Sequence, residues 1–149
     1  MKFLAATIAL VAAAVVNACE DQPAQSIWTN YATEPDFNIT NMTIDPNPFC
    51  VGENACGTIV GSLLAPITAP STLTLMGTYF GVTLYSYSAD FCTLVSCPVA
   101  QSTTTLEYCF PILSTFPAGL SLDLDLSVTN GNGNTLFWQK TTSSMKFVN

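Results

Sequence analysis

The sequence predicts an all-β fold, a β-sandwich made of six or seven short strands. Segments rich in β-branched and aromatic residues recur along the chain, and clusters of Pro, Gly, Asn and Asp separate them. In the clearest segment, residues 120–128, five apolar residues alternate with four polar ones, so one face is expected to be buried. No segment of useful length shows the periodicity of a helix.

The first eighteen residues are expected to be a secretory signal peptide rather than part of the fold. Lys2 supplies a positive start, residues 3–16 are apolar, and small residues before Cys19 resemble a cleavage site. The apolar run is too short to span a bilayer as a helix. A bacterial lipoprotein site at Cys19 is an alternative that Asn17 fits poorly. The remaining 149 − 18 = 131 residues are enough for one domain.

Charged residues are few and mostly acidic. Without Lys2, two lysines stand against ten acidic residues, a net charge of −8. Such a chain should be repelled by nucleic acid and by anionic membranes at neutral pH. The chain contains neither Arg nor His, which excludes Arg phosphate clamps, His-based catalytic triads and His-ligated metal sites.

The chain is expected to begin with an extended lead-in, residues 20–33, in which Ile27, Trp28 and Tyr31 are able to dock. The strand candidate at residues 37–44 changes parity part of the way along, because its first two buried positions are odd and its last two are even. A bulge near Asn41 would keep all four apolar residues on the buried face.

Two sequons lie in the same segment, Asn38-Ile-Thr40 and Asn41-Met-Thr43. Asn38 and Asn41 are therefore possible N-glycosylation sites in a eukaryotic secretory pathway. Either sequon taken alone is at least as well explained by chance in a chain rich in Thr.

The other strands follow in order. They are expected at residues 58–66, 73–84 (with a break at Gly77 or Gly81), 103–110, 120–128 and 135–148. Residues 130–134, Asn-Gly-Asn-Gly-Asn, predict a hairpin turn, because Gly and Asn tolerate a positive φ.

Six cysteines in a secreted chain predict disulfide bonds. The most economical pairings close two short loops, Cys50–Cys56 and Cys92–Cys97. Two alternatives stay open for Cys19 and Cys109: they pair with each other, or Cys109 is a buried free thiol. A zinc site at the four close cysteines is a competing interpretation that the secreted context disfavours.

Several short motifs occur in an order found in one family. They are Met42-Thr-Ile-Asp-Pro46 before Cys50 and Cys56, Asp90-Phe-Cys92 with Cys97-Pro-Val99, Pro111-Ile112 with Phe116-Pro117, and Leu136-Phe137. Over about residues 28–149 the chain therefore resembles the ML lipid-recognition domain family. That family includes the Niemann–Pick type C soluble sterol carrier and the phosphatidylglycerol/phosphatidylinositol transfer proteins.

One position departs from the family pattern. The family usually ties its N-terminal segment to its last strand through a third disulfide. At the matching positions this chain has Asn30-Tyr31 and Phe137-Trp138, with no cysteine at either end.

The resemblance implies an immunoglobulin-like sandwich of two antiparallel sheets that holds a lipid between them, with no cofactor and no catalytic residue. It implies a lining of Leu106, Tyr108, Phe110, Ile112, Leu122, Leu124, Leu126 and Phe137. Residues expected to gate the mouth, on loops, are Tyr79, Phe80, Val82, Leu84, Tyr85 and Phe116. Taken singly, each of these aromatic residues fits a filled core better than a cavity lining.

The leading hypothesis is a secreted or vacuole-like lumenal, monomeric lipid carrier that contacts membranes or a lipid acceptor only transiently. With no Arg and only two lysines, a sterol or other neutral lipid is favoured, and a phospholipid held by its acyl chains comes second. The alternative is a secreted recognition or surface module with a filled core. An enzyme is disfavoured, because Glu107, Asp123 and Asp125 all fall on parities predicted to face solvent.

Overall fold

The computed structural model describes Cys19 and residues 27–149. The predicted signal peptide lies outside the described residues. Among the described residues, no helix has the length and apolar character needed to cross a membrane.

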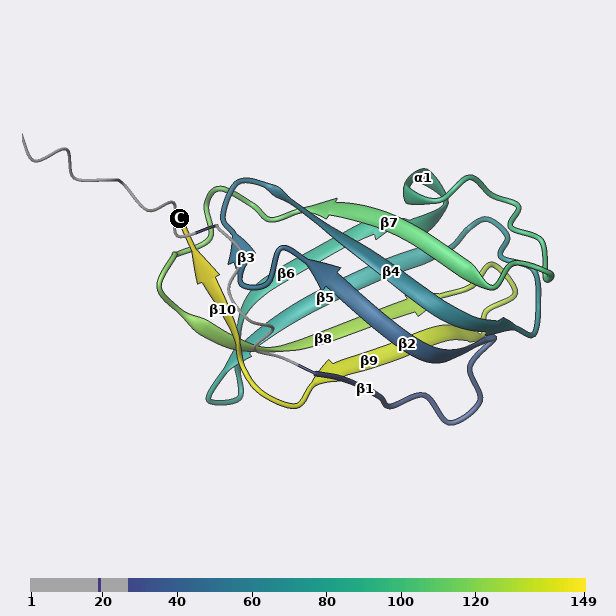
Figure 1. Cartoon of the computed structure of the whole chain (residues 1–149), viewed down its shortest axis with the longest axis horizontal. Helices are drawn as coiled ribbons and strands as arrows, with labels where there is room; N and C mark the ends of the chain where they lie inside the picture. The colour runs from purple at the N-terminus through teal and green to yellow at the C-terminus, as the bar shows by residue number, and fades with distance from the viewer. Residues whose placement is uncertain (1–18, 20–26) are drawn as a thin grey trace, which may run out of the picture.

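Two β-sheets pack face to face, which confirms the predicted β-sandwich (Figure 1). The larger sheet contains β1 (Trp28–Asn30), β3 (Phe49–Cys50), β5 (Thr72–Tyr79), β6 (Val82–Asp90), β8 (Ser121–Thr129), β9 (Thr135–Thr141) and β10 (Met145–Val148). The smaller sheet contains β2 (Phe37–Asp45), β4 (Asn54–Leu63) and β7 (Thr105–Pro111), in the order β2-β4-β7. The strand pairs are antiparallel, except that β10 runs parallel to β3.

The sheet order places different strands at the edges of the sandwich. In the larger sheet β6 pairs only with β5, and in the smaller sheet β7 pairs only with β4. The β2 strand lies at the other edge of its sheet and contacts β1 and β9.

The predicted bulge in the first strand is confirmed. Ile39 pairs with Gly61 and Asn41 pairs with Val60, which leaves Thr40 as the extra residue. The Thr40 hydroxyl donates a hydrogen bond to the Val60 carbonyl at 3.1 Å. A Cβ at Gly61 would overlap the Asn38 carbonyl oxygen, so glycine permits the close approach of the two strands here.

The bulge also decides where the two sequons point. Side chains three residues apart in a regular strand face opposite sides of the sheet. With one residue bulged out, Asn38 and Asn41 both lie exposed on the outer face of β2, while Phe37 and Ile44 are both buried.

The predicted strand boundaries were correct only in part. The break predicted at Gly81 within residues 73–84 is confirmed, because the chain turns at Phe80 and Gly81, both with positive φ, and forms the β5–β6 hairpin. The segment predicted as one final strand is split into β9 and β10, which pair with different parts of β8. The strand predicted at residues 58–66 begins earlier, at Asn54.

Of the two predicted loop disulfides, Cys92–Cys97 is confirmed and closes the loop that contains helix α1 (Phe91–Leu94). The predicted Cys50–Cys56 pairing is wrong: Cys50 pairs with Cys19, and Cys56 pairs with Cys109. Both alternatives for Cys19 and Cys109 are therefore wrong as well.

The topology explains why the nearer pairing fails. The chain passes from β3 in the larger sheet to β4 in the smaller sheet between Cys50 and Cys56. Cys56 instead lies directly opposite Cys109 in the β4–β7 register, with a Cα–Cα distance of 4.0 Å. Residues that lie directly opposite each other on antiparallel neighbours are close enough for a disulfide.

A buried carboxylate, Asp36, links the β1–β2 connection to the β8–β9 turn, and Asn130 of that turn also bonds the β4–β5 connection. Asp36, which is 8% exposed, accepts hydrogen bonds from the side-chain amides of Asn130, Asn132 and Asn134 at 2.8, 2.8 and 3.2 Å. Asn130 also donates to the Pro66 carbonyl at 3.1 Å. Burial alone raises the pKa of Asp36, but the three hydrogen bonds outweigh it, so this pKa is lower than usual.

The parity of β8 gives the first testable prediction. Leu124→Asp should abolish folding, because Leu124 is 2% exposed and the new carboxylate would have no partner. Asp123→Asn, on the exposed side of the same strand, should change the free energy of unfolding by less than about 0.5 kcal/mol. Urea unfolding monitored by circular dichroism measures both. Equal tolerance of the two substitutions would show that the assigned parity is wrong.

The Asp36 cluster gives the second prediction. Because its folded-state pKa lies below its unfolded value near 4, Asp36 contributes stability that is present above that value and is lost as the pH falls through the folded-state pKa. Asp36→Asn should cost about 1–3 kcal/mol at pH 7 and flatten the loss of stability between about pH 5 and pH 3. Denaturant unfolding across this range measures the slope. Glu107→Gln, at an exposed carboxylate of β7, is the control and should keep the wild-type slope; an unchanged slope in Asp36→Asn would contradict the prediction.

Candidate functional site

The residues predicted to line a lipid site lie together between the sheets. Each of them is at most 7% exposed; they are Leu106, Tyr108, Phe110, Ile112, Leu122, Leu124, Leu126 and Phe137. They come from β7 of the smaller sheet, from the residue that follows it, and from β8 and β9 of the larger sheet. Strict alternation along β7 and β8 turns these side chains inward and turns their polar neighbours outward.

Aromatic rings form a continuous run through this interior. Tyr108 contacts Phe137 and Phe110, with ring centroids 6.3 and 6.2 Å apart. Phe110 then contacts Phe49 at 6.1 Å, and Phe49 contacts Phe147 at 5.4 Å in an edge-to-face arrangement. The run joins both sheets, so the interior is apolar along its length.

Sequence reasoning missed three members of this run: Phe49, Phe91 and Phe147, all fully buried. Phe91 packs edge-to-face on Tyr108 at 5.5 Å and lies in the loop closed by Cys92–Cys97. Phe49 follows a Pro-Asn-Pro turn, so no alternating pattern marked it. The signal that was available is the size of these side chains, since large apolar residues next to turn motifs usually need a place in the core.

The predicted gate residues divide into two groups. Tyr85 and Phe116 are buried, 4% and 6% exposed, with ring centroids 5.1 Å apart. The Tyr85 hydroxyl donates a hydrogen bond to the Pro111 carbonyl at 3.4 Å, which links the edge strand β6 to the end of β7. Burial raises the pKa of Tyr85 to about 12. These two side chains therefore close the edge of the sandwich between β6 and β7.

The other gate residues lie outside the interior, on the β5–β6 hairpin. Tyr79, Phe80, Val82 and Leu84 are 42%, 88%, 61% and 46% exposed, and we call residues 79–84 the apolar hairpin. Tyr79, Val82, Leu84 and Tyr85 belong to strands, so their predicted position on loops was wrong. The alternation of β6 points Tyr85 inward and its even-numbered neighbours outward, so the structure does not bring Val82 or Leu84 to the interior.

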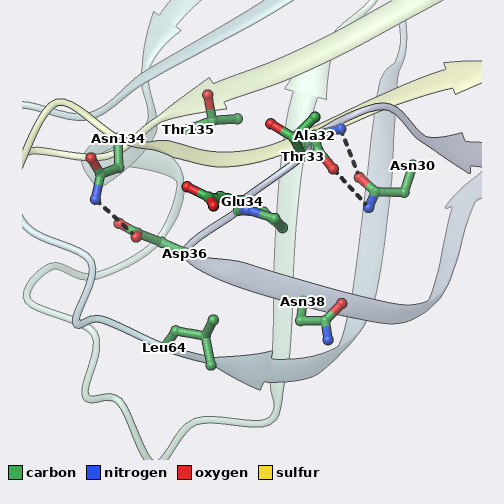
Figure 2. A pocket seen from close by; sticks show the side chains of 10 residues that line it. Asn30, Ala32, Thr33, Glu34, Asp36, Asn38, Leu64, Asn134 and Thr135 are labelled. Atoms are coloured by element: carbon green, nitrogen blue, oxygen red, sulfur yellow. Dashed lines mark hydrogen bonds between the residues drawn. The ribbon is translucent and has the colours of Figure 1, made fainter.

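A separate cleft of about 560 Å³ lies beside the Asp36 cluster (Figure 2). Its lining comes from the β1–β2 connection and from the start of β9, and includes Asn30, Glu34, Asp36, Asn134 and Thr135. Such polar walls do not suit an acyl chain or a sterol ring system, so the apolar interior is the better candidate for a lipid.

No metal site is evident in the part of the chain that the structure describes. There, no group of three or more Cys, Asp or Glu side chains is arranged to hold an ion.

An aromatic pair stands where the family pattern has its third disulfide. The Tyr31 amide donates to the Trp138 carbonyl at 2.8 Å, and the two rings lie 6.0 Å apart. The Lys140 ammonium lies 4.9 Å from both ring centroids and 3.0 Å from the Asp125 carboxylate. A tilted ring contact and a cation–π contact thus join the end of β1 to β9 without a covalent bond.

Comparisons with known proteins agree with this geometry. A Niemann–Pick type C2 protein from Japanese carpenter ant superposes with a TM-score of 0.60 at 14% identity, over 81% of this chain and 98% of the ant protein. Chicken MD-1 complexed with lipid IVa superposes with a TM-score of 0.55 at 14% identity, over 80% of this chain and 87% of MD-1. At such low identity the two superpositions show a shared fold.

The sequence comparisons identify the family. No curated protein matches the chain in sequence. The family model described as the ML domain matches residues 26–142, which is most of the chain and includes nearly all of the strands described above. The chain is a member of the ML domain family.

Proposed function

We propose that the mature chain, residues 19–149, is a single-domain, non-enzymatic lipid carrier that holds a sterol or a phospholipid between its two β-sheets. The observation that carries the proposal is the interior itself, which is lined from both sheets by apolar and aromatic side chains. Membership of the ML domain family and the fold shared with a lipid IVa complex of chicken MD-1 support a lipid ligand.

The energetics favour an apolar ligand. Burying roughly 400 Å² of lipid surface at about 25 cal/mol per Å² gives an upper bound of ~10 kcal/mol before the costs of association. Both lysines of the mature chain are outside the interior: Lys140 pairs with Asp125, and Lys146 is exposed. An anionic headgroup inside would therefore lack a cationic partner, which favours a neutral sterol or buried acyl chains.

The apolar hairpin is the surface best suited to meet a membrane. It presents four large apolar side chains to solvent and contains no charged residue. Its second strand, β6, forms the edge of the sandwich that Tyr85 and Phe116 close. A lipid leaving the bilayer at the hairpin would meet that edge first.

The three disulfides suit an oxidising compartment, so we place the protein outside the cell or in a lumen of the secretory pathway. Glycans on Asn38 and Asn41 would lie at the β2 edge, across the smaller sheet from the β7 edge.

A recognition module without transfer activity is the second candidate. It is favoured by the close contacts of the interior rings, such as Phe116 on Phe147 at 4.2 Å, which describe a packed core. The two functions differ in one property, namely whether the interior admits a ligand.

The test of the carrier function is ligand binding. We expect an organic extract of the protein, purified from a eukaryotic secretory host, to contain a lipid, and we expect the delipidated protein to bind dehydroergosterol or a fluorescent phospholipid. Leu106→Gln should stay folded and bind about tenfold more weakly, a loss of about 1.4 kcal/mol. Glu107→Gln, on the outer side of the same strand, is the control and should bind as the wild type does.

Two outcomes would contradict the carrier function. If the wild type binds neither a sterol nor a phospholipid and its extract holds no lipid, the recognition module replaces the carrier. If Leu106→Gln unfolds the protein, the interior is a close-packed core that does not tolerate a polar side chain at this position.

The hairpin gives a further prediction. Phe80→Asp should lower partition of the protein onto phosphatidylcholine vesicles by about tenfold or more, because it replaces an insertable ring with a charge. Thermal unfolding should be unchanged, since Phe80 is 88% exposed. Ser86→Asp adds the same charge at an exposed position of β6 away from the turn and is the control. Vesicle co-sedimentation measures both; equal partition of the two variants would remove the hairpin from the membrane contact.

A further inference from the structure

The Cys56–Cys109 disulfide differs from the other two disulfides in its exposure to solvent. Both of its cysteines are exposed, on the outer face of the smaller sheet. In the Cys19–Cys50 bond the second cysteine is 1% exposed, and in the Cys92–Cys97 bond both cysteines are partly buried. Thiol–disulfide exchange begins when a thiolate reaches a sulfur atom, so access favours reaction at Cys56–Cys109.

This disulfide joins an edge strand to its neighbour in the sheet. In the smaller sheet β7 pairs only with β4, and Cys109 lies opposite Cys56 within that pairing (Figure 1). An edge strand has ladder hydrogen bonds on one side only, so it separates from its sheet more easily than a central strand does. The disulfide therefore adds a covalent bond where the smaller sheet opens most easily.

Acidic side chains lie beside the two sulfur atoms on the same face. Asp45 is opposite Cys56 in the β2–β4 register, and Glu107 is two residues before Cys109 on β7. Both carboxylates are exposed, and the three strands of the smaller sheet contain no Lys. A thiol reagent that carries its own carboxylate is therefore repelled more strongly than one whose only charge is the attacking thiolate.

The packing of β7 does not depend on the disulfide alone. The inward side chains of β7 include Leu106, Tyr108 and Phe110, which are buried in the interior. The Tyr85 hydroxyl also donates to the Pro111 carbonyl at the end of β7. These contacts remain when the disulfide is reduced, so reduction should loosen β7 without unfolding the sandwich.

We propose that Cys56–Cys109 is a thiol–disulfide exchange site for an uncharged dithiol, and that its reduction loosens β7 from β4. One thiolate of the dithiol attacks one of the two sulfurs, the S–S bond breaks, and the other sulfur leaves with the electron pair and takes a proton from water. The second thiol of the reagent then attacks the mixed disulfide and releases the second cysteine as a thiol. The protein gains two electrons, and the dithiol is oxidised to a cyclic disulfide. The inference goes beyond the proposed lipid-carrier function and does not depend on it.

The first test measures which disulfide is reduced first. The protein secreted by a eukaryotic host is treated with a limiting amount of dihydrolipoamide, free thiols are alkylated, and the labelled peptides are mapped by mass spectrometry. The cysteines of Cys56–Cys109 should be labelled about tenfold faster than those of Cys92–Cys97. Dihydrolipoate, the same dithiol with a carboxylate, should react about threefold more slowly at low salt, and the difference should fade at high salt.

The second test measures the loosening of β7 by amide hydrogen exchange. In the reduced protein, exchange should be about tenfold faster in β7 than in the oxidised protein. Exchange in β8, a central strand of the larger sheet, is the internal control and should stay as it was. The double variant Cys56→Ser with Cys109→Ser should reproduce the faster exchange of β7 without any reductant, and the reduced wild type tests the same point if this variant fails to fold.

Four results would overturn the inference. They are reduction of Cys92–Cys97 first or at the same rate, equal rates for the two reagents at low salt, exchange in β7 that stays at its oxidised value, and exchange that also rises in β8. The last result would show that reduction weakens the whole sandwich rather than its edge. None of these results bears on the carrier function, which the lipid content of the organic extract tests separately.

Discussion

The aromatic run between the sheets is the contact on which the rest of the molecule depends. A three-stranded sheet with one apolar face cannot hide that face by itself, so β2, β4 and β7 need the larger sheet as a cover. Phe110 and Tyr108 contribute from the smaller sheet, and Phe137 and Phe147 contribute from the larger one. Edge-to-face ring pairs contribute about 0.5–1.5 kcal/mol each beyond the area they bury. The disulfides, the Asp36 cluster and the Tyr31–Trp138 pair lie around this interior and connect the segments at its periphery.

Local patterns in the sequence predicted the parts of the fold that depend on alternation. The inward sets on β7 and β8 follow from the two-residue period of a strand, which a single sequence displays directly. The bulge at Thr40 followed from the same rule, since the four apolar residues of β2 could share a face only with one extra residue between them. Gly and Asn in residues 130–134 marked the β8–β9 turn for a conformational reason, and Gly133 has a φ of +88°.

What the sequence could not predict depends on contacts between distant segments. The partner of Cys56 is decided by the β4–β7 register, in which Cys109 lies opposite, and nothing near Cys56 in the chain reveals that register. Phe49 and Phe91 lie in short elements without an alternating pattern, so their burial appears only when both sheets are in place. The exposure of Val82 and Leu84 depends on which way β6 faces after the turn at Gly81.

The apolar hairpin has a consequence for the behaviour of the protein in concentrated solution. The exposed side chains of the apolar hairpin, Phe80 among them, form a patch that can associate with the same patch on another molecule. Ten acidic residues against three lysines give the chain a net charge of −7 at pH 7, and this common charge keeps molecules apart. In acid the carboxylates gain protons and the repulsion between molecules weakens, whereas the apolar patch contains no charged residue and keeps its hydrophobic character. Colloidal stability is therefore lowest near the isoelectric point of about 4.1 and at high ionic strength, so storage and crystallisation are best begun at neutral pH and low salt.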